Sequence, residues 1–172
     1  MKKQGIRIFG IDPGYGRVGW GIVEGSSQEW RHVAHGCIET TPNTPHIPRL
    51  SQISKELIKI IEMYQPDCSA VEDLFFYRNV TTAIQVGQAR GVILLTLHNA
   101  KVPIEEFTPL QVKQAVTGYG KADKKQVQKM VQVMLNLKKI PSPDDAADAL
   151  AVALAAGVAL MFKAKTRITN KK

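Results

Sequence analysis

The stretch Ile6-Arg7-Ile8-Phe9-Gly10-Ile11-Asp12-Pro13-Gly14 decides the fold of this chain. Its apolar run predicts a largely buried strand, and Asp12 ends that strand where proline and glycine turn the chain sharply. A buried carboxylate without a charge partner is costly, or it takes up a proton. Asp12 is therefore expected to face a cation, although a turn-capping role with hydrogen bonds from the next backbone amides is an alternative.

Strands and helices alternate along the rest of the chain. Further strands are expected at Val18–Val23, Trp30–Thr40, Cys68–Glu72 and Val102–Phe107, and the first three strands should form an antiparallel meander. Helices are expected in a segment that ends before Pro66, over Thr81–Asn99, from a Thr108 cap and Pro109 to Gly118, through Val127–Leu135, and in a last segment that Ser142-Pro143-Asp144-Asp145 opens. The alternation predicts an α/β fold, with a mixed five-stranded sheet flanked by helices.

Three more acids occupy positions that invite a cation. Glu72 ends its strand as Asp12 ends the first, whereas Asp145 and Asp148 lie three apart at the start of an apolar helix. Taken singly, Glu72 is typical of a surface salt bridge, and Asp145 suits the positive end of a helix. Asp148 lies beyond the first turn, on the same face as Asp145, and should point at positive charge. Four such carboxylates suit two divalent ions about 3.5–4 Å apart around one phosphate.

The type of ligand restricts the type of metal. No histidine falls near these acids in the sequence, which argues against a zinc site and against a Ser-His-Asp triad. Carboxylate oxygens are hard ligands, so the candidate cofactor is Mg²⁺, two ions per site, with Mn²⁺ as a substitute.

The formal net charge of +8 suggests a nucleic-acid partner, but much of it belongs to the last ten residues, which contain no acid. We expect residues 163–172 to form a basic, disordered tail after a single domain over residues 1–162. A second group of basic residues is either a solvated helix face or a phosphate-binding surface: Lys113, Lys121, Lys124, Lys125 and Lys129.

Other features of the sequence favour a cytoplasmic protein without a membrane segment. The longest apolar run, Ala149–Phe162, is shorter than the roughly 18 residues that span a bilayer. The first residues lead directly into a strand rather than into a signal peptide. Cys37 and Cys68 lack metal-ligand spacing, and we expect them to be buried free thiols.

Five short stretches carry a resemblance to a known family. They are Ile11-Asp12-Pro13-Gly14, Val71-Glu72-Asp73-Leu74-Phe75-Phe76, Gly87-Gln88-Ala89-Arg90-Gly91, Gln111-Val112-Lys113-Gln114 and Asp145-Ala146-Ala147-Asp148-Ala149-Leu150-Ala151. In this order they resemble the motifs of the RuvC family of Holliday junction resolvases, over about residues 6–162. The resemblance implies a ribonuclease H-like fold, a homodimer and Mg²⁺-dependent cleavage of a four-way DNA junction.

The resemblance also implies roles for particular residues. Asp12, Glu72, Asp145 and Asp148 would be the catalytic, metal-binding carboxylates. Phe75 would stack on a base at the branch point, a role that its neighbour Phe76 could also take, because two adjacent phenylalanines cannot both face the core. The remaining candidate DNA-binding residues are basic: Arg78, Arg90, Lys113, Lys121 and Lys124.

The function implied is a structure-selective endonuclease of homologous recombination and DNA repair. It would make paired symmetric nicks in two strands of like polarity, by two-metal-ion hydrolysis that leaves 5′-phosphate and 3′-hydroxyl ends. The family also implies a junction-binding and branch-migration helicase complex as partner. One alternative is a non-catalytic nucleic-acid-binding module on the same fold, but the presence of all four acids argues against it. A second alternative is an actin-like phosphotransferase, but that fold needs a second lobe and 172 residues leave no room for one.

Overall fold

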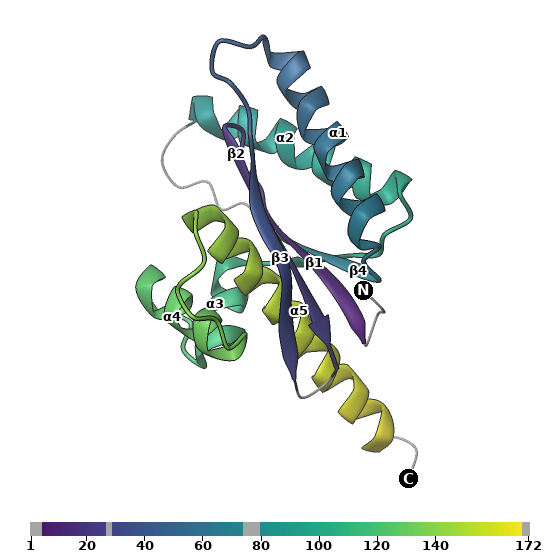
Figure 1. Ribbon diagram of the computed structural model, residues 1–172, viewed down its shortest axis with the longest axis vertical. Coiled ribbons are helices and arrows are strands. Elements are labelled where there is room, and N and C mark those ends of the chain that lie inside the picture. Colours follow the sequence, from purple (N-terminus) through teal and green to yellow (C-terminus); the bar gives the residue numbers. More distant parts are fainter. Residues whose placement is uncertain (1–4, 27–28, 74–79, 170–172) are drawn as a thin grey trace.

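The computed structural model describes residues 5–26, 29–73 and 80–169, and its ribbon is drawn in Figure 1. The strands are β1 (Ile6–Asp12), β2 (Arg17–Gly25), β3 (Trp30–Glu39), β4 (Cys68–Glu72) and β5 (Ile104–Phe107). The helices are α1 (His46–Tyr64), α2 (Val80–Asn99), α3 (Pro109–Thr117), α4 (Lys124–Met134) and α5 (Asp144–Thr169). The elements expected from the sequence are all present, with ends that differ by a few residues.

The five strands form one sheet in the order β3-β2-β1-β4-β5. β1 pairs antiparallel with β2, and β2 pairs antiparallel with β3, which confirms the meander. β1 also pairs parallel with β4, and β4 with β5. The sheet is therefore mixed, and β1 lies where its antiparallel half meets its parallel half. The predicted α/β fold, with a mixed five-stranded sheet, is confirmed.

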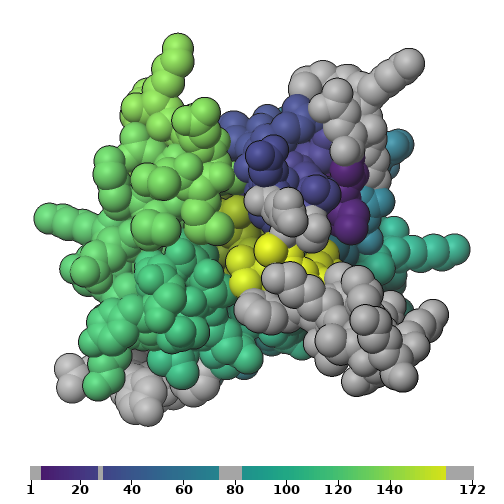
Figure 2. Space-filling model, turned by 90° about the horizontal axis from the view of Figure 1, so that it is seen from below, coloured from purple at the N-terminus to yellow at the C-terminus, as the bar shows by residue number. Residues whose placement is uncertain are grey.

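Helices cover both faces of the sheet (Figure 1). α1 and α2 pack on one face around Phe9, Ile53 and Leu97. α5 packs on the other face around Ile8 and Leu150, with α3 and α4 beside it. Viewed from below, α5 lies between the green surface of α3 and α4 and the blue and purple surface of the first strands (Figure 2). Alternate residues of β1 thus belong to two separate cores, as the period of two in a strand requires.

α5 lies unusually close to the sheet because glycines face it. A Cβ atom added to Gly10 of β1 would overlap the carbonyl oxygen of Ala149, and one added to Gly19 of β2 would overlap that of Asp145. Glycine is needed at both positions because the helix backbone occupies the space that a side chain would fill. This contact sets the height of the first turns of α5 above the ends of β1 and β2.

The two short helices have well-formed beginnings. Thr108 caps α3, and its side chain and that of Gln111 exchange hydrogen bonds with the opposite backbone N–H groups. Asp123 and Gln126 form the same reciprocal arrangement at the start of α4. Such a capping box satisfies two backbone donors that a helix otherwise leaves free. The predicted helix start at Thr108 is confirmed, and the two boxes fix the ends of the turn that joins α3 to α4.

Three expectations need correction or stay untested. The sequence analysis assigned residues 163–169 to a basic, disordered tail, whereas the structure describes their backbone as a continuation of α5 to Thr169. Alanine, lysine and arginine are good helix formers, and the segment prolongs an existing helix. Residues 170–172 lie outside the described part of the chain. Cys37 and Cys68 are thiols that are not joined in a disulfide, as predicted, but they are partly rather than fully buried. Among the described helices, none is long and apolar enough to cross a membrane.

The contact between Gly10 and α5 leads to a stability prediction. Gly10→Ala should destabilise the protein by about 1–3 kcal/mol or more, because the new methyl group has to displace the backbone of α5. The urea midpoint, measured at an unchanged slope, tests this. Gly87→Ala in α2 is the matched control: a Cβ there meets nothing within 4 Å, and the change should stabilise by roughly 0.5–1 kcal/mol. Equal effects in both variants would contradict the account of Gly10.

Candidate active site

Asp12 and Glu72 lie side by side at one edge of the sheet. Ile11 of β1 is in register with Val71 of β4, and the two strands run parallel, so the next residue of each leaves the sheet at the same edge. The two carboxyl groups are close enough to share a hydrogen bond. The sequence argument that matched these two strand ends is therefore supported by the geometry.

α5 brings the other two acids to the same edge. Asp12 is in register with Gly19 of β2, and Gly19 is the residue against which the backbone of Asp145 packs. Asp148 follows one turn later on the same helix face. The charges of Glu72, Asp148 and Asp145 all act on the carboxyl group of Asp12. All four candidate acids thus lie in one cluster, which we call the acid cluster.

The acid cluster holds its protons more tightly than ordinary carboxyl groups do. Burial, with the charges of Glu72, Asp148 and Asp145, raises the pKa of Asp12 to about 8. Burial and the charge of Asp148 raise the pKa of Glu72 to about 7. The pKa of Asp148 is raised as well, mainly by burial. These shifts share one physical cause: negative charge is collected where little water can solvate it.

Two lysines supply part of the missing positive charge. The Nζ atom of Lys124, the first residue of α4, lies 2.8 Å from Oδ2 of Asp148 and 3.5 Å from Oδ2 of Asp144. Lys113 on α3 and Lys124 both lower the pKa of Glu72, which places both ammonium groups near the cluster. On the other side, Nη1 of Arg17 lies 3.8 Å from Oδ2 of Asp145.

The acid cluster suits a hard divalent cation by its chemistry. All four ligands would be carboxylate oxygens, which Mg²⁺ prefers, and the raised pKa values show that positive charge is in deficit there. In the described residues, however, no three histidine, cysteine, aspartate or glutamate side chains converge tightly enough to hold an ion. Asp148 is turned to Lys124 and Asp145 to Arg17, so a metal ion would draw these carboxylates inward.

The other residues proposed to bind DNA have varied surroundings. Arg90 on α2 is engaged within the protein, because its guanidinium forms ion pairs with Asp73 and Glu106 and its Nε lies 3.4 Å from the carbonyl oxygen of Glu72. It braces the end of β4, and a contact with DNA stays a prediction. Lys121 is exposed beside the turn that joins α3 to α4. Phe75, Phe76 and Arg78 lie outside the described residues.

Sequence reasoning missed two partners of the acids. Arg17 begins β2, opposite the end of β1, and it reaches both Asp145 and Glu39. Asp144 comes one residue before Asp145 and so points away from the helix face that Asp145 and Asp148 share, yet its exposed carboxylate contacts Lys124. A long basic side chain can cross that angular gap. The only available signal was the excess of basic residues near the cluster, and it does not say which acid each of them contacts.

The fold and the acid cluster together define a class, the ribonuclease H-like nucleases. The sequence model of one family in that class, described as crossover junction endodeoxyribonuclease RuvC, matches residues 8–156. The chain belongs to this RuvC family, as the motifs in its sequence had indicated.

Individual relatives agree with this assignment. The chain is 54% identical to the crossover junction endodeoxyribonuclease RuvC of Thermosipho melanesiensis over 157 residues, which are 91% of this chain and all of that one. It is 54% identical to the RuvC of Chloroflexus aurantiacus over 87% of this chain and 91% of that one. Its structure resembles Thermus thermophilus RuvC in complex with a Holliday junction substrate, with a TM-score of 0.88, 35% identity and coverage of 92% and 96%.

A more distant structure shows the fold alone. The yeast mitochondrial Holliday junction resolvase has a TM-score of 0.68 at 12% identity, with 99% of this chain and 88% of that one covered. The architecture is thus retained where little sequence identity remains.

The raised pKa of Asp12 predicts how stability depends on pH in the absence of metal. In the folded state Asp12 keeps its proton up to about pH 8, whereas in the unfolded chain it loses it near 3.8. Between these values the unfolded state binds fewer protons, so this group lowers stability as the pH rises. Asp12→Asn should therefore stabilise the metal-free protein by about 1–3 kcal/mol at pH 8, and by less at pH 5.

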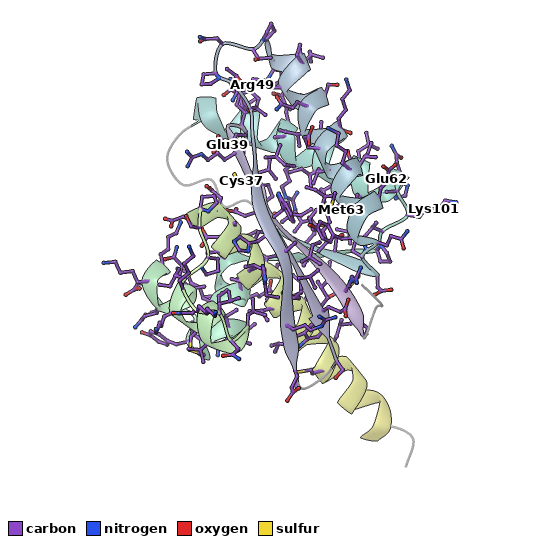
Figure 3. All side chains as sticks on the ribbon, in the orientation of Figure 1. Cys37, Glu39, Arg49, Glu62, Met63 and Lys101 are labelled. Atoms are coloured by element: carbon purple, nitrogen blue, oxygen red, sulfur yellow. The ribbon has the colours of Figure 1, made fainter. Side chains whose placement is uncertain are left out.

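Chemical denaturation in EDTA at both pH values measures this difference. Glu62→Gln is the control, because Glu62 is an exposed acid on α1, on the other face of the sheet (Figure 3). Asp12→Asn stabilising equally at pH 5 and pH 8 would contradict a proton held by the acid cluster.

Proposed function

We propose that this protein resolves four-way DNA junctions, by making paired symmetric nicks in two strands of like polarity. The observation that carries the proposal is the acid cluster, with Lys113 and Lys124 beside it. Carboxylates whose negative charge is not balanced by nearby positive groups can bind the cations that phosphodiester hydrolysis needs, and lysines next to them can bind the phosphate. Membership in the RuvC family supports the four-way junction as the substrate.

Asp12, Glu72, Asp145 and Asp148 would hold two Mg²⁺ ions. When bound, these ions would lower the pKa of the attacking water and offset the negative charge that develops on the phosphate. To act as ligands the acids have to give up their protons, and for Asp12 and Glu72 this happens only near neutral pH or above without metal. Lys113 and Lys124 would orient the strand by its phosphates. Hydrolysis would leave 5′-phosphate and 3′-hydroxyl ends.

Two symmetric nicks require two copies of the site. The described residues of one chain contain one acid cluster, and a four-way junction has approximate two-fold symmetry, so a homodimer would supply the second site. We place the contact between copies on the α1 and α2 face. Ile58 and Leu95 are 41% and 59% exposed there, and both line a groove between the two helices, on the side of the sheet opposite α5.

The dimer is tested by sedimentation of the DNA-free protein. A species of about twice the chain mass of 19.0 kDa is expected. Leu95→Glu should shift the protein toward single chains, since a charge would be buried without a partner in the contact. Val133→Glu is the control, at an equally exposed position on α4. Dissociation by Val133→Glu instead would place the contact on the other face.

The acid cluster itself leads to a prediction about cleavage. Asp12→Asn, Glu72→Gln and Asp148→Asn should each abolish Mg²⁺-dependent cleavage of a synthetic junction, because each removes a ligand charge from the site. Junction binding should remain, since it depends on phosphate contacts rather than on the acids. Anisotropy of a labelled junction, next to a cleavage assay, separates the two.

Asp144→Asn is the matched control for these variants, because Asp144 is 70% exposed and is not one of the four proposed ligands. It should retain cleavage. A loss of binding that parallels the loss of cleavage in the acid variants would mean that the acids are structural, and binding without any cleavage by the wild-type protein would favour a non-catalytic module.

Lys113 and Lys124 predict a salt effect. If each contacts a phosphate, Lys113→Ala or Lys124→Ala should weaken junction binding and reduce the log-log salt dependence by about one unit per contact. Lys59→Ala on α1 is the control, because Lys59 pairs with Glu56 on the opposite face of the sheet. If the salt dependence of binding is the same as in wild type for both variants, these lysines have only an intramolecular role.

A further inference from the structure

A pair of histidines on the outer strand has no part in the acid cluster. His32 and His35 both lie on β3, with Nε2 of His32 2.7 Å from Nδ1 of His35. Their ring centroids are 4.8 Å apart, and the rings are tilted by 59°. Both side chains are partly buried. Figure 3 labels Cys37 and Glu39 further along the same strand. β3 is the last strand of the sheet on its side, so the pair lies at the sheet margin.

An irregularity of the strand brings the two rings together. In a regular strand, residues three apart point to opposite faces of the sheet. Here the register passes from Val23 opposite His32 to Ile22 opposite Ala34, which leaves Val33 as the extra residue of a β-bulge. His32 therefore faces the same side as Val23, and His35 the same side as Gly21, which is the side that carries α5. Bulges commonly re-aim side chains in this way.

The surroundings keep both rings neutral and orient one of them. Burial lowers the pKa of His32, with a contribution from His35, and burial also lowers the pKa of His35. Both rings then carry a nitrogen lone pair at neutral pH. The backbone of Ser142 has the opposite, smaller effect on His35, as expected for a carbonyl group that accepts a hydrogen bond from a ring N–H. With Nδ1 turned toward His32, that N–H falls to Nε2.

We propose that His32 and His35 form a second metal site, which binds Zn²⁺ through Nε2 of His32 and Nδ1 of His35. Imidazole nitrogen suits borderline ions such as Zn²⁺, whereas Mg²⁺ avoids it. A ligating histidine usually donates its other N–H to a carbonyl group, and Ser142 is placed to accept it from His35. The ion would lie between the two nitrogens where a proton now lies, and that proton would move to Nδ1 of His32.

The geometry needs only a small adjustment. At Zn–N distances of about 2.0–2.1 Å and a tetrahedral angle, the two nitrogens lie about 3.3–3.4 Å apart, so they have to separate by about 0.6 Å. A slight rotation of two partly exposed rings provides this. No third histidine, cysteine or acid converges with them in the described residues, so water molecules complete the coordination. Such a site is open rather than fully enclosed by protein.

The position of the site gives it a structural consequence. Ser142 lies two residues before the start of α5, the helix that carries Asp145 and Asp148. An ion on His35 would strengthen the hold of that ring on Ser142, and would brace β3 against the segment that leads into α5. The second site thus borders the acid cluster but differs from it in ligand type, and the two sites select different metals.

Calorimetric titration with Zn²⁺ tests the proposal, in a buffer that contains millimolar Mg²⁺ as a competitor for the carboxylates of the acid cluster. The wild-type protein should bind one Zn²⁺ per chain. His32→Asn and His35→Gln should each weaken this binding by at least about tenfold, since the loss of one of only two protein ligands is severe. His98→Gln is the control, at an exposed histidine in the last turn of α2, and it should bind Zn²⁺ as the wild type does.

A second measurement covers the case in which a variant folds poorly. Long-range ¹H–¹⁵N spectra of the wild-type protein should show His35 protonated on Nε2, and Zn²⁺ should shift the ring nitrogens of His32 and His35 but not those of His46 or His98. Zn²⁺ affinity within twofold of wild type in both His32→Asn and His35→Gln, or shifts at all four histidines alike, would overturn the proposal. Mg²⁺-dependent junction cleavage should be unchanged in both variants, which separates this site from the nuclease.

Discussion

The contact of α5 with the sheet is the constraint on which the candidate site depends. Gly10 and Gly19 leave room for the helix backbone itself, so the first turns of α5 lie directly over the ends of β1 and β2. Asp145 and Asp148 come within electrostatic reach of Asp12 for this reason. With larger residues at the two glycine positions, α5 would lie farther from the sheet, and its carboxylates would be separated from the ends of the strands. A packing detail thus decides whether four acids act as one site.

The sheet also divides the molecule into two working faces. The core under α5, α3 and α4 supports the acid cluster and the lysines beside it. The core under α1 and α2 is separate, and the surface above it exposes apolar side chains such as Ile58 and Leu95. The proposed hydrolysis on one face and the proposed contact between copies on the other would not compete for the same residues. β1 joins the two, since its alternate side chains enter both cores.

Much of this arrangement could be predicted from the sequence, because its signals are local. Strand and helix periodicity, the Thr108 cap and the acids at strand ends gave the elements and the candidate ligands. The side-chain partners could not be predicted in the same way. The pairing of Lys124 with Asp148, and that of Arg17 with Asp145, depends on how helices and strands pack in three dimensions. The bulge at Val33 was equally hidden, since only the pairing with β2 reveals it. At the end of the chain, charge composition indicated disorder, whereas the structure describes α5 as continuing to Thr169, which depends on the helix that precedes this segment.

The ion pair of Lys124 and Asp148 makes α4 sensitive to what happens at the acids. A divalent cation that engages Asp148 has to compete with an ammonium group fixed to the first residue of α4. Thermodynamic linkage is reciprocal: the Lys124–Asp148 ion pair weakens cation binding by the same free energy by which a bound cation weakens the ion pair. If Lys124 contacts phosphate and Asp148 binds metal as proposed, a phosphate that drew Lys124 away would make Asp148 available to the metal ion, and a bound metal ion would make Lys124 available to the phosphate. Metal and nucleic acid would therefore bind with positive cooperativity through a single side chain, without any movement of the sheet.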